Sequence, residues 1–210
     1  VEAMHYLLMR DSIHGSMDDE ILLNGNDLTY DGNSTRLLPG SAPGTIPWDA
    51  FDVDIVIDST GVYRKKEQLQ LHLDSGARRV LVTKPPADEI DRIVIQGINH
   101  DKINSKDQII STTSSTTQVL ALMLKVLDQN FGIENAMMTN VHAYTSDQPL
   151  ADSVRSDLRR SRSAVENIIP NETWAPDYVS QLLPKFKNKI SGMAMNLSLI
   201  HISEPTRRTI

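Results

Sequence analysis

Short apolar segments that alternate with a helix-forming segment constrain the fold of this chain more than any other feature. Apolar runs at Val53–Asp58 and Val80–Thr83 flank Lys65–Leu73, in which apolar residues recur at helical spacing. Two further short runs follow, at Ile93–Ile95 and Ile109–Ser111. Strands buried in a parallel sheet are apolar along most of their length. The pattern therefore predicts a doubly wound α/β sheet.

The second half of the chain predicts a long helix and two more strands. Thr117–Asn130 is apolar on most faces, which predicts a buried helix. Ile133–His142 and Ile190–Met195 read as strands, and Ala175–Leu183 reads as a helix with a proline in its first turn. At the other end, residues 1–10 predict a helix, and three short strands at 21–23, 28–30 and 36–38 predict an antiparallel meander.

Composition excludes several classes of protein. The 210 residues carry 21 Lys and Arg against 27 Asp and Glu, a net charge of −6, which opposes broad electrostatic binding to nucleic acid or to a membrane surface. The longest apolar run, Val119–Leu124, is too short to span a bilayer. There is no cysteine, and no pair of histidines has metal-ligand spacing, so we expect a cytoplasmic protein without disulfides or a metal site.

Seven consecutive hydroxyl residues, Ser111–Thr117, lead from a strand into the long helix. One or two of them are explained by capping of the helix N-terminus. The others favour an anion site, because free amides and the helix dipole at this position stabilise negative charge. His142 lies at the carboxyl end of a predicted strand, where an α/β fold places its chemistry, although a lone histidine is more often structural.

The chain resembles phosphorylating glyceraldehyde-3-phosphate dehydrogenase through a series of segments in the same order. The family's segments are DS-x-HG, ESTGVF, GVNH, SNASCTT, NFGI, TTVHA, DLRR, NIIP and GMA. The matching segments here begin at Asp11, Asp58, Gly97, Ser111, Asn130, Thr139, Asp157, Asn167 and Gly192. The resemblance covers about residues 2–196. It implies a Rossmann-type dinucleotide-binding domain followed by an α/β catalytic domain.

The resemblance also implies an activity, the NAD-dependent oxidative phosphorylation of glyceraldehyde 3-phosphate. Its partners would be a phosphorylated aldehyde and inorganic phosphate, in a homotetramer, and NADP remains open as the coenzyme. The family's catalytic cysteine falls on Ser115 and its base on His142. A serine hydroxyl is far less acidic than a thiol, and an ester is a poorer acyl donor than a thioester. We therefore predict low or absent dehydrogenase activity.

Other positions match the family's phosphate-binding residues or depart from them. Thr116, Thr145 and Thr173 match hydroxyls that bind substrate or inorganic phosphate. Arg162 lies in the family's loop near those sites, where a solvated or subunit-contact role is equally consistent. Two departures would weaken phosphate binding. These are Trp174, where the family has a glycine, and Asn196, where it has an arginine that binds the substrate phosphate.

The cofactor residues implied by the resemblance follow two neighbouring strands. Thr60 and Gly61 match the segment that contacts the dinucleotide, although a simple strand-to-helix turn would explain them equally well. Thr83 ends the next strand, where the family lines the nicotinamide side, and Lys84 is unusual there.

The domain organisation expected from the resemblance has three parts. Residues 1–114 would form a partial NAD-binding domain, and residues 115–196 a partial catalytic domain. The family's glycine-rich phosphate loop would precede residue 1, so we expect an internal fragment. Residues 197–210 have no counterpart in the family and resemble a translated sequencing adapter, with a divergent natural tail as the alternative.

Two other functions stay open. A non-catalytic homologue could keep the nucleotide-binding fold for regulation or assembly. A serine esterase could use Ser115 and His142, but no third residue that would orient the histidine is evident from the sequence. Recovery of dehydrogenase activity by Ser115→Cys would distinguish the enzyme from the binding protein.

Overall fold

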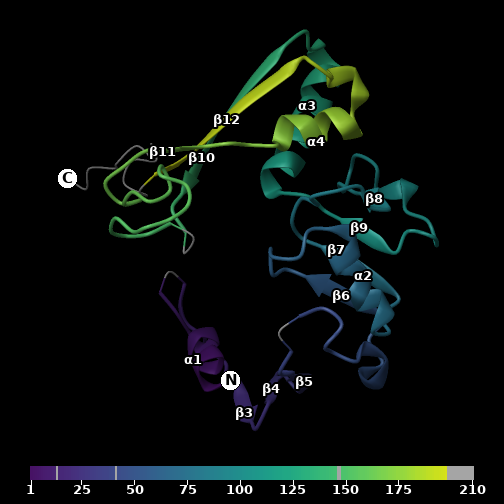
Figure 1. Cartoon of the computed structure of the whole chain (residues 1–210), viewed down its shortest axis with the longest axis vertical. Coiled ribbons are helices and arrows are strands. Elements are labelled where there is room, and N and C mark those ends of the chain that lie inside the picture. Colours follow the sequence, from purple (N-terminus) through teal and green to yellow (C-terminus); the bar gives the residue numbers. More distant parts are fainter. Residues whose placement is uncertain (13, 41, 146–147, 198–210) are drawn as a thin grey trace.

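The computed structural model describes residues 1–12, 14–40, 42–145 and 148–197. Along the chain, an N-terminal helix and meander come first, a parallel sheet with α2 second, and a mixed sheet with α3 and α4 last (Figure 1). Among the described residues, no helix is both long and apolar enough to cross a bilayer. The predicted adapter-like tail, apart from Leu197, lies outside the described residues.

The N-terminal region contains a helix and two small antiparallel sheets. Its elements are α1 (Glu2–Met9), β1 (Arg10–Asp11), β2 (Gly15–Ser16), β3 (Leu22–Asn24), β4 (Asp27–Tyr30) and β5 (Asn33–Arg36). The predicted meander is confirmed as the sheet β3-β4-β5, but its third strand was placed wrongly, at 36–38. Asp31 and Gly32 both have positive φ, and this two-residue turn brings Asn33 directly opposite Tyr30.

The predicted parallel sheet is confirmed. Its strands are β6 (Ile55–Asp58), β7 (Arg79–Val82), β8 (Arg92–Ile93) and β9 (Ile109–Ser111), all parallel and in the order β6-β7-β9-β8. Helix α2 (Lys66–Asp74) contributes Leu69 to the core beneath this sheet, among Val80, Val82, Ile90 and Ile109. Short 3₁₀ helices, η1 (Trp48–Phe51) and η2 (His100–Lys102), lie in the connections.

Strand β6 is buried on one face only, which corrects the expectation of a fully buried strand. Val56 is buried and pairs with Val80 in register, so its side chain points to the same face of the sheet as Val80. Successive side chains of a strand point to opposite faces, so Ile55 and Ile57 point away from that core. They are 55% and 62% exposed, because β6 is an edge strand and α2 covers only the face that carries Val56.

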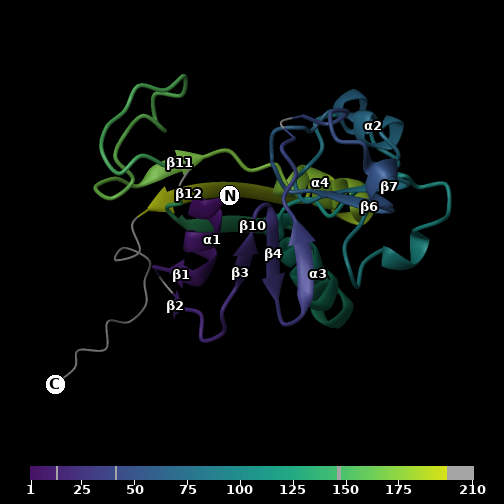
Figure 2. The same cartoon turned by 90° about the horizontal axis from the view of Figure 1, so that it is seen from below.

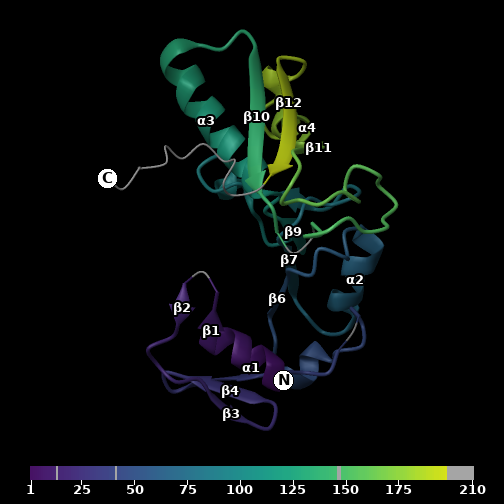
Figure 3. The same ribbon diagram turned by 90° about the vertical axis from the view of Figure 1, so that its left-hand side faces the viewer.

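Helix α3 (Ser115–Phe131) is likewise buried on one side only, although its sequence predicted burial on most sides. Leu120, Ala121 and Leu124 pack in a second core with Ile95, Val179 and other residues of α4 (Ala175–Leu182) and the 3₁₀ helix η3 (Pro184–Phe186). The opposite side of α3 remains exposed at Val119, Met123, Val126 and Leu127. Val119, Met123 and Leu127 line a groove between this side of α3 and β10, two elements that lie next to each other in Figure 3.

The mixed sheet has the order β10-β12-β11. Strands β10 (Ala136–Ala143) and β12 (Ile190–Leu197) are parallel over their whole length, and β11 (Ile169–Asn171) pairs antiparallel with β12 (Figure 2). The predicted strands at 133–142 and 190–195 are confirmed with shifted ends. Strand β12 extends to Leu197 because Leu197 pairs with Ala143, a contact between distant segments of the chain.

Candidate functional site

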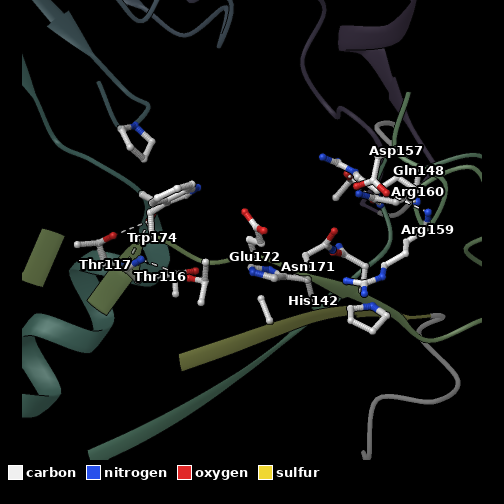
Figure 4. A pocket seen from close by; sticks show the side chains of 18 of the residues that line it. Thr116, Thr117, His142, Gln148, Asp157, Arg159, Arg160, Asn171, Glu172 and Trp174 are labelled. Atoms are coloured by element: carbon white, nitrogen blue, oxygen red, sulfur yellow. Dashed lines mark hydrogen bonds between the residues drawn. The ribbon is translucent and has the colours of Figure 1, made fainter. Parts of the chain in front are cut away.

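A cleft of about 960 Å³ opens where the first turn of α3, the end of β10 and the segment before α4 meet. Trp174 and Thr117 lie on one side of it, and Asp157, Arg159 and Arg160 lie on the opposite side (Figure 4). The cleft therefore carries both hydroxyl and guanidinium donors, which suit an anionic ligand.

Three residues of the hydroxyl run build the entry to α3. The Ser114 hydroxyl accepts a hydrogen bond from the Thr117 amide at 3.1 Å and lies 2.8 Å from the Thr117 hydroxyl. The Ser111 hydroxyl donates to the Lys84 carbonyl at 2.8 Å and accepts from the Thr113 amide at 2.9 Å. Capping and turn formation thus account for Ser111, Ser114 and Thr117.

Thr113, two residues before the helix, is strained and unsatisfied. Its φ of 57° lies in the left-handed region, which is unfavourable for a β-branched side chain. Its hydroxyl oxygen is buried and lacks a hydrogen-bond partner among the described residues. Strain of this kind persists only where the surrounding structure enforces it, and here it precedes the residue predicted as the nucleophile.

Ser115 is the first residue of α3 and is exposed. With Thr116 and His142, it lines a second, mostly apolar groove of about 510 Å³ between α3 and β10. Among the described residues, the Ser115 hydroxyl makes no hydrogen bond to His142, and no carboxylate binds the ring of His142. The sequence placed these two residues in one region, and the structure agrees, but a Ser-His-Asp arrangement is not formed.

The side-chain amide of Asn140 stands between Thr116 and His142. Its Nδ2 lies 2.6 Å from Thr116 Oγ1 and 2.8 Å from His142 Nε2. Sequence reasoning had not singled out Asn140. Its place two residues before His142 on the same strand was the available signal, since such residues share a face of the sheet.

The predicted phosphate-binding residues divide between the cleft and the surface. Thr116, Thr145 and Thr173 all line the cleft. The Thr145 hydroxyl donates to Gln148 Oε1 at 3.0 Å, and the Thr173 hydroxyl accepts from the Ala175 amide at 3.4 Å. Arg162 does not line the cleft. It forms an exposed ion pair with Asp152 at 2.6 Å.

The two residues that differ from the family's phosphate-binding residues, Trp174 and Asn196, both line this cleft. Trp174, 63% exposed, precedes α4 and presents its indole to the cleft (Figure 4). Asn196 is buried on β12, where it pairs with His142 of β10. Its side-chain oxygen accepts a hydrogen bond from the side-chain amide of Asn171. The cleft therefore has an amide pair where the family's arginine would supply charge. Glu172 adds a carboxylate between its two sides, as Figure 4 shows.

Gly192, from the GMA segment, allows β12 to approach α4 closely. A Cβ atom at this position would lie 2.9 Å from Pro176 Cγ and 3.1 Å from Met138 Cε. It would also lie 3.4 Å from the Thr173 methyl. The absence of a side chain at Gly192 therefore sets how near the Thr173 segment lies to the sheet.

The predicted cofactor residues lie together at the carboxyl ends of β6 and β7, not in the cleft. The amide and hydroxyl of Thr60 donate to Asp58 Oδ1 at 2.9 and 2.7 Å, and the Thr83 amide donates to the Asp58 carbonyl at 3.1 Å. Gly61 has a φ of +72°, and a Cβ there would lie 3.5 Å from Lys84. A turn of this shape at the carboxyl edge of a parallel sheet is where nucleotides bind.

A half-buried tryptophan and a buried histidine support that turn through Asp58. The Trp48 indole donates to His72 Nδ1 at 3.1 Å, and His72 Nε2 lies 3.6 Å from Asp58 Oδ2. Burial lowers the pKa of His72, and the nearby Asp58 opposes this effect without overcoming it. Neither Trp48 nor His72 was predicted as part of a site. Within the described part of the chain, no group of histidine and carboxylate side chains could hold a metal ion.

Comparison with known proteins supports the predicted family. Residues 1–66 match the model of the glyceraldehyde 3-phosphate dehydrogenase NAD binding domain, and residues 114–205 match that of its C-terminal domain. The chain is 41% identical over 199 residues to glyceraldehyde-3-phosphate dehydrogenase of Geobacillus stearothermophilus, covering 94% of this chain and 59% of the relative. It is 42% identical over 193 residues to glyceraldehyde-3-phosphate dehydrogenase 2 of Streptomyces avermitilis, covering 91% and 57%.

The chain thus spans less than three fifths of the length of these curated relatives. Within that span both of the family's domain models match, the NAD binding domain before the C-terminal domain. The chain belongs to the glyceraldehyde-3-phosphate dehydrogenase family.

Proposed function

We propose that the chain is part of an NAD-dependent, phosphorylating glyceraldehyde-3-phosphate dehydrogenase whose oxidation step is impaired by Ser115. The observation that carries this proposal is the position of Ser115 as the first residue of α3, beside Thr116 and in one groove with His142. A helix N-terminus favours the anionic form of a nucleophile placed there. With a thiol this suffices at neutral pH, whereas a hydroxyl also needs a base within hydrogen-bond reach.

The chain's own residues would perform three tasks. Residue 115 attacks the aldehyde carbon and bonds to it through its side-chain oxygen. His142 is the base available to take the proton released from that oxygen, a role that requires a free ring nitrogen. Thr116, Thr145 and Thr173, which line the cleft, bind the phosphate groups of the substrate and of the acceptor. The adduct is a hemiacetal and becomes an acyl ester only after its carbon has given up a hydride to the bound coenzyme. Inorganic phosphate would then attack the acyl carbon and displace the oxygen of residue 115, giving an acyl phosphate.

NAD fits the turn after β6. Gly61 has the positive φ that glycine favours, and Asp58 fixes the conformation of Thr60 through two hydrogen bonds. We propose that Thr60 and Gly61 contact the dinucleotide and that Thr83 lies on the nicotinamide side. When bound, the nicotinamide supplies a hydride acceptor. The choice between NAD and NADP, a homotetramer and a cytoplasmic location are proposals taken from the family.

A Ser115→Cys variant in the complete gene tests the proposal. We expect NADH production from glyceraldehyde 3-phosphate and inorganic phosphate to be low in the unsubstituted protein and to rise at least about tenfold in the variant. Ser115→Ala is the matched control and should abolish any residual turnover. Robust turnover by the unsubstituted protein would contradict the proposed impairment.

A non-catalytic nucleotide-binding role is the second candidate. It is favoured by three features together, namely Ser115, the Trp174 indole in the cleft and the Asn171–Asn196 amide pair. If it is correct, Ser115→Cys would bind NAD but recover no dehydrogenase activity. Calorimetric titration of both proteins with NAD, alongside the turnover assay, separates the two candidates.

A further inference from the structure

We propose that Asn140 is a positioning residue that occupies His142 Nε2 and so keeps this ring from acting as a base toward residue 115. The proposal deepens the proposed function and rests on it for the role of residue 115. Its starting point is the pair of contacts made by Asn140 Nδ2, 2.6 Å from Thr116 Oγ1 and 2.8 Å from His142 Nε2.

These contacts use the full donor capacity of the amide. An asparagine Nδ2 carries two protons, and here one meets the Thr116 hydroxyl oxygen while the other meets His142 Nε2. Nε2 therefore accepts, and the ring proton of neutral His142 lies on Nδ1. A base must offer a free lone pair to the nucleophile's proton, and the lone pair of Nε2 is already engaged.

The backbone explains why the amide reaches both partners. Asn140 and His142 are two residues apart on β10, so their side chains leave the same face of the sheet. Thr116 lies in the first turn of α3, which borders that face at the groove between α3 and β10. Asn140 thus links His142 to the residue after Ser115 and not to Ser115 itself.

The consequence is that two separate residues limit nucleophilic attack. The hydroxyl of Ser115 is only weakly acidic, and Asn140 engages the ring nitrogen with which His142 would act as the base. Replacing Ser115 by cysteine alone would supply a thiol assisted by the helix N-terminus but not by His142. Removing the amide as well would let the ring and the thiol interact. The effects of the two substitutions should therefore be strongly non-additive.

The chain offers a clean experiment because it contains no cysteine, so any thiol chemistry in a variant comes from residue 115. Four variants of the 210-residue chain form a cycle, namely Ser115→Cys alone, with Asn140→Ala, with His142→Gln, and with both. The readout is the rate of alkylation by iodoacetamide between pH 5.5 and 9, followed by mass spectrometry. All four keep the charged side chains of the adjoining cleft, Asp157, Arg159, Arg160 and Glu172.

We expect Asn140→Ala to raise the alkylation rate at pH 6 by about tenfold in the Ser115→Cys background, because His142 can then stabilise the thiolate. Adding His142→Gln should remove that gain. A merely structural effect of Asn140 would be the same whether or not His142 is present. No gain on removing the amide, or a gain that persists without His142, would overturn the proposal.

A second measurement reads the unsubstituted chain and needs a variant only to assign its signals. The nitrogen-15 chemical shifts of the His142 ring report which nitrogen carries the proton, and His142→Gln identifies the signals. We expect the proton on Nδ1, and a proton on Nε2 would overturn the proposal. Neither readout needs NAD or phosphate. If the alkylation rates follow this expectation but Ser115→Cys recovers no dehydrogenase turnover, only the proposed function is refuted.

Discussion

The turn after β6 and the first turn of α3 differ in where their polar groups find partners. Asp58 is buried and binds the amide and hydroxyl of Thr60, two residues away. In α3, Ser115 is exposed, and Thr116 is bound by Asn140 from a strand 24 residues later in the chain. The turn after β6 is thus fixed by local contacts, whereas the surroundings of Ser115 depend on how α3 and β10 meet. The comparison implies that substitutions around Asp58 act mainly on stability and that those around Ser115 act mainly on chemistry.

The largest effect is expected for Asp58→Ala. This substitution removes both hydrogen bonds to Thr60 and leaves buried His72 without its only nearby carboxylate in the described chain. We expect the free energy of unfolding to fall by about 3 kcal/mol, measured by urea denaturation. Asp58→Asn keeps an acceptor for Thr60 and should cost less than half as much. Equal, small losses for both would show that the turn does not depend on Asp58.

A smaller loss is expected for Gly192→Ala in the cleft region. The new Cβ would meet Pro176 and Met138 at 2.9 and 3.1 Å, so β12 and α4 must separate. We expect about 2 kcal/mol of destabilisation by urea denaturation. Ser191→Ala, at the exposed neighbouring position, is the matched control and should change the free energy of unfolding by less than about 0.5 kcal/mol. An unchanged free energy of unfolding in Gly192→Ala would mean that β12 and α4 are packed loosely enough here to accept a methyl group.

The free energy of unfolding should vary with pH because of the protonation of His72. Burial lowers its pKa in the folded chain, so the unfolded chain binds more protons once the pH falls below the ordinary histidine value of about 6.5. The stability that His72 supports is therefore present above that pH and is lost on acidification, with a slope of at most about 1.4 kcal/mol per pH unit. Urea unfolding at pH 7.5 and 5.5 measures this loss.

The matched variants for that titration are His72→Gln and His100→Gln, the latter at an exposed histidine. Replacing His72 should flatten the difference in unfolding free energy between the two pH values, whereas replacing His100 should leave it unchanged. If both variants keep the full difference, other groups cause the acid sensitivity.

The smallest effect on stability is expected for Trp174→Ala, because the indole is 63% exposed. The free energy of unfolding should change by less than about 1 kcal/mol, while affinity for inorganic phosphate in the cleft rises severalfold as the crowding is relieved. Calorimetric titration at fixed ionic strength measures the affinity. Trp174→Phe keeps most of the bulk and should show no gain. A gain in that variant as well would assign the effect to something other than size.

Sequence patterns were sufficient where local physics decides the structure. The parallel strands, α2 and α3 followed from apolar runs and helical spacing. Capping by one hydroxyl of the run 111–117 followed from the need to satisfy free helix amides, and the structure identifies that residue as Ser114. The third strand of the meander was misplaced because its residues, Asn33–Arg36, are all polar and exposed, so no apolar pattern marks them as a strand.

Burial was harder to predict than secondary structure. Ile57 on β6 and Met123 on α3 are apolar but exposed, at 62% and 57%, because burial depends on which elements pack against each face. For the same reason, the extension of β12 to Leu197 could be seen only from its pairing with β10. The division of the chain at residue 115 stays a prediction.

The sequence by itself determined the family resemblance, the parallel sheet and the serine at the start of α3, since these lie in the order and chemistry of neighbouring residues. Only the tertiary structure decided that Asn140 binds His142, that Asn171 pairs with Asn196, and that Arg162 turns outward to Asp152. Each side chain could have had several partners, and the choice among them depends on distances between segments that no local pattern encodes.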